Sequence, residues 1–341
     1  MHVLTFGEVL LRLAASGYTR LFQKDYLDAT FCCGEANVAV SLAMFGLDVS
    51  FLTKLPANDI GRAATNSLRY FGVDTSKIVY GDGRMGLYYL EKGASQRPSK
   101  VIYDRKYSSI ALAQQTDFDW EEIFKDIDWF HWSGINPALS SNMTVMCKNA
   151  CKTAKRMGIT VSCDLNYRKK LWDSETAQNT MTELMQYVDV CIANEEDTDK
   201  VLGIKPKDTD VENGIIFKEN YIEVAKEICG KYGCKYVGIT LRESCSASMN
   251  GWEAMIYSSE NNEAYFSEKY YIQLVDRVGG GDSFAAGLIY GLIAGKEMHD
   301  VIDFAVASSC LKQTLEGDYN RVTVEEVEQL LKSKGSGRIQ R

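Results

Sequence analysis

The chain reads Asp276-Arg277-Val278-Gly279-Gly280-Gly281-Asp282-Ser283-Phe284-Ala285-Ala286-Gly287 at the start of an apolar helical pattern that continues to residue 293. Glycines at this point allow the backbone to approach a ligand closely. The N–H groups of Gly279, Gly280 and Gly281, with the helix start behind them, form a site for an anion such as a phosphoryl group. Asp282 could accept a proton from an attacking hydroxyl, so the stretch predicts phosphoryl transfer.

There are three alternatives to this prediction: a purely structural role for Asp282, a dinucleotide-binding motif and a P-loop motif. Asp282 could merely cap the helix, and the loop taken alone does not exclude that. The dinucleotide motif Gly-x-Gly-x-x-Gly fails because residue 284 is Phe, and the P-loop motif Gly-x-x-x-x-Gly-Lys-Ser/Thr does not occur. Rossmann dehydrogenases and P-loop kinases therefore lose their main support.

Strand and helix patterns alternate on either side of this stretch. Strands are predicted at residues 3–6, 49–52, 128–132, 159–163, 190–193 and 236–240, and helices at residues 37–45, 60–71, 143–157, 176–187, 222–232, 281–293, 301–315 and 324–332. Such alternation predicts an α/β fold, a doubly wound and mainly parallel sheet with helices on both faces. Ligands of such sheets bind at the carboxyl ends of the strands.

Two segments, about 8–30 and 78–110, break the alternation. Strands predicted at residues 10–13, 86–92 and 100–108 would form a small sheet outside the main body. Residues 246–271 read as further antiparallel strands. We expect a single domain over residues 1–332, followed by a mobile tail at 333–341, which is crowded with Lys, Gly and Ser.

Composition limits the classes of function. The 38 Lys and Arg against 46 Asp and Glu give a formal charge of −8, without a basic run, which argues against nucleic acid as a partner. No apolar run is long enough to cross a membrane, and the first residues lack a signal-peptide pattern. Ten scattered cysteines without a Cys-x-x-Cys predict reduced thiols and a cytoplasmic protein, with little support for zinc.

Three short motifs, in order along the chain, resemble those of one enzyme family. Residues 33–37 read Cys-Gly-Glu-Ala-Asn, residues 194–197 read Asn-Glu-Glu-Asp, and residues 279–284 read Gly-Gly-Gly-Asp-Ser-Phe. They resemble the N-terminal signature, the Asn-x-x-Glu motif and the C-terminal signature Gly-Ala-Gly-Asp-Ser/Ala-Phe of the pfkB (ribokinase-like) carbohydrate kinases. Asp197 stands in place of Glu and Gly280 in place of Ala, and the resemblance covers nearly all of residues 1–332.

The resemblance implies a ribokinase-like fold with a small β-sheet lid and a kinase that uses ATP and Mg²⁺. It implies that Asp282 is the base, that the three glycines hold the transferring phosphate, and that Gly34, Glu35, Asn37 and Asp318 lie at the sugar. The nucleotide side is expected at Asn166, Asn194, Thr240 and Arg242, with Mg²⁺ held through water near Asn194 and Asp197. A K⁺ site at Asp276 and Val278 is a further expectation from the family, and lids that clasp two subunits imply a homodimer.

Finer features resemble the 2-keto-3-deoxygluconate kinase branch, where matching residues hold a sugar acid. These features are the stretches at residues 7–13, 103–105 and 164–172, with Tyr88 in the pattern Gly-Leu-Tyr. Tyr103 and Arg105 lie two apart on a predicted strand and so share one face. A guanidinium fork binds a carboxylate with two hydrogen bonds, and Arg168 follows a strand at the expected ligand edge. The alternative for either Arg is a surface ion pair.

Several functions stay open at this point. The leading one is ATP-dependent phosphorylation of 2-keto-3-deoxygluconate to its 6-phosphate. The alternatives are a pfkB kinase for another sugar, such as fructose or 2-keto-3-deoxygalactonate, and a sugar-acid-binding regulator without catalysis. The two Arg argue against a neutral sugar, and the intact Asp282 with its glycines argues against the silent regulator.

Overall fold

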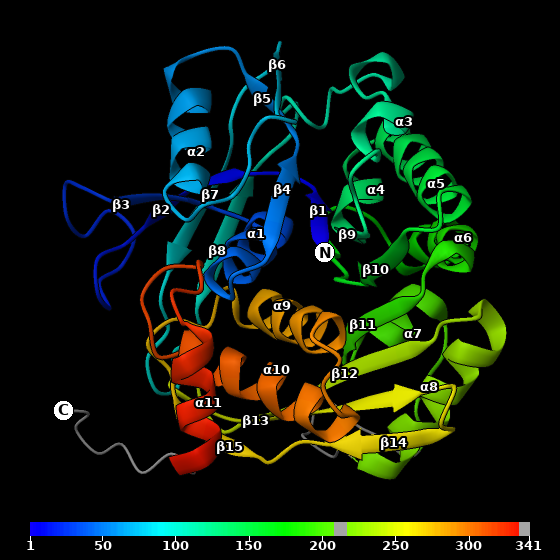
Figure 1. The fold of residues 1–341 in the computed structure, drawn as a ribbon. Coiled ribbons are helices and arrows are strands. Elements are labelled where there is room, and N and C mark those ends of the chain that lie inside the picture. Colours follow the sequence, from blue (N-terminus) through cyan, green and yellow to red (C-terminus); the bar gives the residue numbers. More distant parts are fainter. Residues whose placement is uncertain (208–216, 334–341) are drawn as a thin grey trace.

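A nine-stranded sheet forms the centre of the molecule in the computed structural model, which describes residues 1–207 and 217–333 (Figure 1). Its strands run in the order β14-β13-β12-β11-β10-β9-β1-β4, with β15 paired to β13. Their bounds are β1 His2–Phe6, β4 Asp48–Leu52, β9 Trp129–Ser133, β10 Thr160–Asp164, β11 Val190–Asn194, β12 Tyr236–Ser244, β13 Met249–Ser258, β14 Glu263–Phe266 and β15 Tyr270–Gln273. The strands from β4 to β12 pair in parallel and β13 pairs antiparallel, so the prediction of a mainly parallel sheet is confirmed.

Helices cover both faces of this sheet, as predicted (Figure 1). One face carries α1 (Gly34–Met44), α2 (Asp59–Arg69), α9 (Gly280–Ile293), α10 (Met298–Lys312) and α11 (Val324–Ser333). The other carries α3 (Trp120–Ile123), α4 (Ile135–Leu139), α5 (Ser141–Arg156), α6 (Ser174–Leu184), α7 (Asp197–Leu202) and α8 (Lys218–Tyr232), with 3-10 turns at Gln115–Asp117 and Met185–Tyr187. In β9, Trp129 packs into one hydrophobic core and Phe130 into the other, because successive strand residues point to opposite faces.

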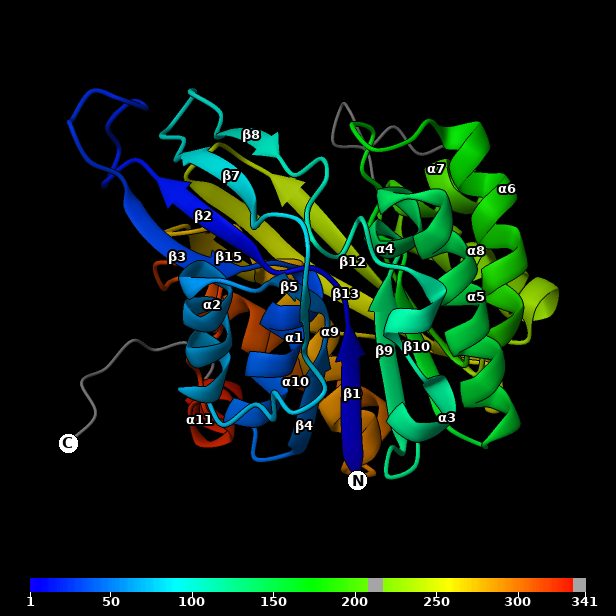
Figure 2. The ribbon, with the colours of Figure 1, turned by 90° about the horizontal axis from the view of Figure 1, so that it is seen from above.

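A four-stranded lid sheet lies apart from the central one. It consists of β3 (Asp28–Cys32), β2 (Leu10–Ala14), β7 (Gly86–Glu91) and β8 (Lys100–Asp104), in that order. Figure 2 shows these strands side by side, and the parallel pair β2 and β7 joins the two segments predicted to form the lid. The short strand β6 (Val79–Gly81) pairs instead with β5 (Lys54–Pro56), so the residues around 80 lie outside the lid sheet.

The arrangement of the two sheets positions one cavity of about 320 Å³. Residues of β7 and β8 line it from the lid side, and residues at the carboxyl ends of β10 and β11 line it from the central sheet. This is the edge where the parallel topology predicts a ligand. Among the residues described, no helix has the length and apolar character to cross a membrane. The predicted tail, apart from Ser333, falls outside the described residues.

Candidate active site

The start of α9 forms one wall of the cavity. Gly279 has a φ of 84°, and a Cβ there would come within 2.2 Å of the Asp318 carbonyl oxygen, so only glycine fits. A Cβ on Gly281 would meet nothing within 4 Å, so this position faces open space. Within the described part of the chain, the N–H groups of Gly281 and Asp282 have no acceptor, as expected for a helix start. They are available to an anion in the cavity.

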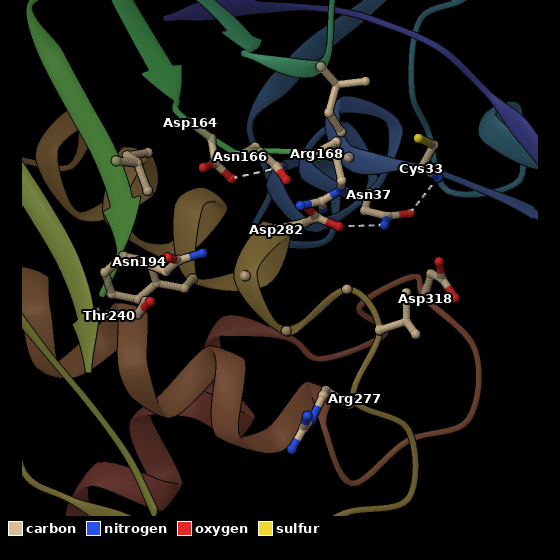
Figure 3. Close-up of a pocket in the computed structure, with 18 of the residues that line it drawn as sticks. Cys33, Asn37, Asp164, Asn166, Arg168, Asn194, Thr240, Arg277, Asp282 and Asp318 are labelled. Atoms are coloured by element: carbon tan, nitrogen blue, oxygen red, sulfur yellow. Dashed lines mark hydrogen bonds between the residues drawn. The ribbon is translucent and has the colours of Figure 1, made fainter. Parts of the chain in front are cut away.

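Asp282 stands in the first turn of α9 and is fixed by the start of α1. Asn37 donates from Nδ2 to Asp282 Oδ2 at 2.6 Å, and Asn37 Oδ1 accepts from the Cys33 N–H at 3.2 Å (Figure 3). A Cβ on Gly34 would lie 4.0 Å from Asp282 Oδ1, so Gly34 borders the carboxylate. Burial raises the pKa of Asp282 to about 6, and the Asn37 hydrogen bond opposes the rise. The group is therefore an ionised base at neutral pH.

Two Arg and two Tyr gather at the lid side of the cavity. The Arg105 guanidinium is 5.5 Å from the ring centre of Tyr103. Burial raises the phenol pKa of Tyr103, and the charges of Arg168 and Arg105 oppose this rise. The Tyr88 and Tyr103 rings are 5.8 Å apart. All four residues line the cavity. They bring two positive charges and two phenols to one place, which suits a carboxylate.

The two Arg differ in what they already bind. Arg105 is buried and donates from Nε to Glu8 Oε2 at 2.8 Å, with Nη2 bound to the same oxygen. Arg168 is half-buried and donates from Nη1 to the Tyr167 carbonyl at 3.0 Å. Across residues 1–207 and 217–333 it has no ion pair. Arg168 is therefore the guanidinium that is freer to meet an anionic ligand.

Asp318 links the cavity to the lid sheet. It is buried, accepts a hydrogen bond from the Tyr88 hydroxyl at 2.7 Å and pairs with Arg12 of β2. Arg12 also pairs with Asp276 Oδ2 at 2.5 Å. The side chain of Asp318 is thus held from two sides, unlike that of a surface turn residue.

The predicted nucleotide residues line the opposite end of the cavity. Asn194 of β11 lies opposite Thr240 of β12 in the parallel register, while Arg242 pairs with Glu195 at 3.1 Å. Asn194 Oδ1 accepts the N–H groups of Glu196 at 2.8 Å and Asp197 at 2.9 Å, so it also fixes the start of α7. Figure 3 shows Asn194 and Thr240 together, across the cavity from Asp318.

Comparison with known proteins assigns the family. The profile described as pfkB family carbohydrate kinase matches residues 33–324. The chain belongs to the pfkB family of carbohydrate kinases. It is 50% identical to the solved structure of 2-dehydro-3-deoxygluconokinase from Thermotoga maritima, with a TM-score of 0.93 over 97% of this chain and 99% of that one.

Two further proteins are similar to this carbohydrate kinase. A 2-dehydro-3-deoxygalactonokinase from Haloferax volcanii is 31% identical over 98% of both chains. The structure of a putative ribokinase II from E. coli in complex with ATP and Mg²⁺ is 21% identical, with a TM-score of 0.79 over 97% of this chain and 99% of that one. At that identity the likeness shows the shared fold.

The kinase fold places most of the predicted site residues around the one cavity. Those that line it are Gly34, Asn37, Tyr88, Tyr103, Arg105, Asn166, Arg168, Asn194, Asp197, Thr240, Arg242, Val278, Gly279, Gly280, Gly281, Asp282 and Asp318. Asp164, Asn250, Trp252 and Arg277 also line it but were not predicted as site residues. Asp164 directly follows the strand predicted at residues 159–163, and its position at the end of that strand is the available signal.

Glu35 does not line the cavity, contrary to the prediction. It points away from the cavity: a Cβ on Gly7 would fall 2.1 Å from its Oε2, so the carboxyl group packs against the end of β1. Burial raises the pKa of Glu35 to about 7. The spacing of the motif was correct, but the direction of a side chain in the first turn of α1 depends on what packs against it.

The expected K⁺ ligands do not fit either. The Asp276 carboxylate pairs with Arg12, and the carbonyl oxygens of Asp276 and Val278 accept hydrogen bonds from the Lys312 ammonium. Groups that would coordinate a monovalent cation are thus already bound to a cation of the chain itself.

The acidic residues that line the cavity fit a Mg²⁺ held mainly by phosphate and water. Asp164 lines the cavity with Asp197, and Asn166 Nδ2 donates to Asp164 Oδ2 at 3.2 Å. Burial, together with the charges of Asp197 and Asp282, raises the pKa of Asp164 well above its ordinary value. A nearby divalent cation would relieve this repulsion. The described residues contain no cluster of three acidic, Cys or His ligands, so a cage made by protein alone is not present there.

Proposed function

We propose that this kinase transfers the γ-phosphoryl group of ATP to the 6-hydroxyl of 2-keto-3-deoxygluconate. One observation carries the proposal: a single cavity holds a helix start with an ionised Asp at one wall and a Tyr–Arg cluster suited to a carboxylate at another. The first part suits phosphoryl transfer and the second suits a sugar acid. The relatives named 2-dehydro-3-deoxygluconokinase and 2-dehydro-3-deoxygalactonokinase support the same class of substrate.

The chain's own groups account for the proton and the charge in this reaction. Asp282 accepts the proton of the 6-hydroxyl as its oxygen attacks the γ-phosphorus, the bond to the β-phosphate oxygen breaks, and ADP leaves. The N–H groups of Gly281 and Asp282 stabilise the charge on the transferring group. Mg²⁺, when bound, neutralises phosphate charge. Asp164 and Asp197 are the residues beside which it would be held, with water between.

Arg168 and Tyr103 would hold the carboxylate of the sugar acid, with Arg105 as a second cation behind them. Arg105 is fixed by Glu8, so its main contribution is to place positive charge and to orient Tyr103. The two Arg therefore have different proposed roles, a difference that their sequence positions do not reveal. Arg168 is the cleaner probe of substrate class, because among the described residues it has no ion pair like the one between Arg105 and Glu8. Its charge also acts on Asp282, so kcat is measured together with KM.

A substrate panel tests the proposal. ADP release would be measured with 2-keto-3-deoxygluconate, its C4 epimer 2-keto-3-deoxygalactonate, gluconate and fructose. We expect both keto acids to be phosphorylated, with the gluconate form giving the higher kcat/KM. Preference for the epimer would favour the assignment of the Haloferax relative. A higher kcat/KM for fructose would overturn the sugar-acid assignment. No ADP release with any of these compounds would favour a sugar-acid-binding regulator without catalysis.

An Arg168 variant tests which group binds the acid. Arg168→Ala should raise the KM for the keto acid by an amount that corresponds to about 1.5–3 kcal/mol, the range for a hydrogen bond to a charged group. Arg168→Lys should restore part of the loss, since an ammonium cannot form the bidentate pair. Lys169→Ala, at an exposed neighbouring cation, is the control and should leave KM unchanged. An unchanged keto-acid KM in Arg168→Ala would contradict this assignment.

We also propose a homodimer formed through the lid sheet, in a cytoplasmic protein. Exposed apolar side chains on the lid support the first part: Phe22 is 74% exposed, Tyr107 71% and Ile102 41%. Ten free thiols support the second, because a reducing compartment keeps thiols free. Light scattering of wild type and of Ile102→Asp would test the dimer, which should dissociate in the variant.

A further inference from the structure

Lys312 is fully buried against the loop at residues 276–281, which is the proposed phosphate-binding loop. It is the last residue of α10 and has no exposed surface. Its Nζ donates to the Asp276 carbonyl at 3.0 Å and to the Val278 carbonyl. Lysine is almost never buried completely unless its charge is compensated, so this placement has a specific role.

The charges around Lys312 balance without any added ion. Two cations, Lys312 and Arg12, lie among the carboxylates of Asp276 and Asp318. Asp282 also acts on Lys312, and its charge is offset by Arg168. Lys312 also stands at the C-terminal end of α10, where the helix dipole favours a positive charge. A further monovalent cation would add uncompensated charge to a buried site. It would also have to displace the ammonium from both carbonyls.

The two carbonyls belong to the loop that sets the start of α9. Val278 directly precedes Gly279, whose positive φ turns the chain into the helix. Gly280 is held in turn by Ser309, whose hydroxyl donates to the Gly280 carbonyl at 2.7 Å. The Lys312 ammonium binds the carbonyl oxygens of both Asp276 and Val278. It therefore fixes the orientation of the loop whose glycines line the cavity.

We infer that the Lys312 ammonium takes the place of an exchangeable monovalent cation, so that this kinase orders its phosphate-binding loop without K⁺. An ammonium group is close to K⁺ in size and charge and offers three N–H donors to carbonyl oxygens. Because it is tethered to α10, it costs no binding entropy when the loop folds. Lys312 acts on the loop and is a positioning residue.

The first test compares the wild-type protein in KCl and in tetramethylammonium chloride at equal ionic strength. ADP is measured directly by chromatography, so that no coupling enzyme adds a cation dependence of its own. We expect kcat/KM to agree within about twofold. The Tm should not change, since a cation that does not bind cannot stabilise the fold. A several-fold stimulation by K⁺, or a Tm that rises with K⁺ concentration, would overturn the inference.

The second test removes the ammonium. Lys312→Ala should lose roughly 10²-fold in kcat, the scale of a misplaced catalytic loop. It should regain at least about tenfold when K⁺ or NH₄⁺ fills the vacated site, with a parallel rise in Tm. Lys226→Ala removes an exposed helical lysine of α8 and should show neither effect. A Lys312→Ala protein that folds and keeps wild-type activity, or shows no response to either cation, would overturn the inference.

The two readouts keep this inference separate from the proposed function. The rate measurements rest on the proposed kinase activity, but the Tm measurements do not. Binding of Tl⁺, used as a K⁺ analogue and observed by ²⁰⁵Tl NMR, does not rest on it either. Wild type should show no bound Tl⁺, and Lys312→Ala should show one site. If Lys312→Ala fails to fold, the wild-type comparison decides alone: indifference to K⁺ together with no bound Tl⁺ upholds the inference, and a K⁺ response or bound Tl⁺ overturns it.

Discussion

In its proposed role as the base, Asp282 must meet two requirements that oppose each other. A base must be ionised, yet the site that makes it useful excludes water and so penalises its charge. The chain meets both by surrounding the carboxylate with one hydrogen-bond donor, Asn37, and with the positive charges of Arg168 and Lys312. The resulting pKa of about 6 leaves Asp282 ionised near neutral pH but close enough to it to accept a proton.

The first prediction concerns the role of Asp282. Asp282→Asn should lower kcat by roughly 10²–10⁴, the usual effect of removing a positioned base. Asp300 occupies the same place in the first turn of α10 but is exposed. Asp300→Asn is therefore a matched control for the loss of a negative charge in the first turn of a helix, and its kcat should stay at the wild-type value. Similar kcat values in wild type and Asp282→Asn would leave Asp282 only a structural role at the start of α9.

The second prediction follows from the raised pKa of the same group. Since Asp282 must be ionised, kcat should fall as the pH drops below about 6. The raised pKa means that the folded protein binds this proton more tightly than the unfolded chain. Its contribution to stability is complete below about pH 4 and is lost as the pH rises through about 6. Asp282→Asn should thus have a higher Tm than wild type at about pH 8, and the difference should shrink toward about pH 5.

Thermal unfolding across this pH range tests the sign. Glu35, whose pKa is about 7, also titrates in this range, so the comparison is made between wild type and Asp282→Asn and not within wild type alone. A variant with a lower Tm than wild type at about pH 8 would show that the ionised Asp282 stabilises the fold, which contradicts its raised pKa.

At the scale of elements, the site depends on two helices that start at the same point. The first turns of α1 and α9 face each other, and Asn37 of one bonds Asp282 of the other. The positive ends of both helix dipoles are thereby directed at the cavity, where they favour a phosphate. The strands contribute through their register, which sets Asn194 beside Thr240.

The third prediction separates glycines that serve folding from those that serve the ligand. Gly279→Ala should destabilise the protein, because its φ of 84° is unfavourable for Ala and the Cβ would meet the Asp318 carbonyl. Gly281→Ala should leave the Tm within about 1 °C, since the added Cβ meets nothing, and should reduce kcat more than ATP affinity. Tm and single-turnover rates measure the two effects. Equal losses of ATP affinity and kcat in Gly281→Ala would assign the loop to ground-state binding.

A buried ion cluster connects the lid sheet to the main body of the molecule. Arg12 belongs to the lid sheet, while Asp276 and Asp318 belong to loops of the main body. The Tyr88 hydroxyl of β7 adds a second link to Asp318. The cluster therefore ties the lid sheet to the loop that begins α9, so a change at the cluster should affect both.

The fourth prediction tests this coupling. Arg12→Met should lower the free energy of unfolding by about 3–5 kcal/mol, because it leaves two buried carboxylates without their cation. Arg62→Met breaks the exposed pair with Asp59 and should cost less than about 1 kcal/mol. Urea denaturation measures both. If Arg12→Met and Arg62→Met cost the same, the cluster does not hold the lid.

Parts of the site that follow from local sequence could be predicted. Gly279 and Asp282 were identified correctly as lining residues because a Gly-rich helix start has the same geometry in any fold. Glu35 was misplaced, since its motif defines the turn of α1 but not the side of the turn that faces the cavity. Arg105 was placed correctly, yet its pair with Glu8 joins residues 97 positions apart and leaves no local pattern.

The sequence by itself determined the alternating sheet and helices, the glycine loop and the place of Asp282, because hydrophobic periodicity and backbone preference act between near neighbours in the chain. The tertiary structure decided the charges around that loop. Arg12 reaches Asp318 across 306 residues, and Lys312 reaches Asp276 across 36. Whether a buried cation meets a carboxylate, a carbonyl or a ligand depends on which elements pack together, and only the folded chain brings those elements into contact.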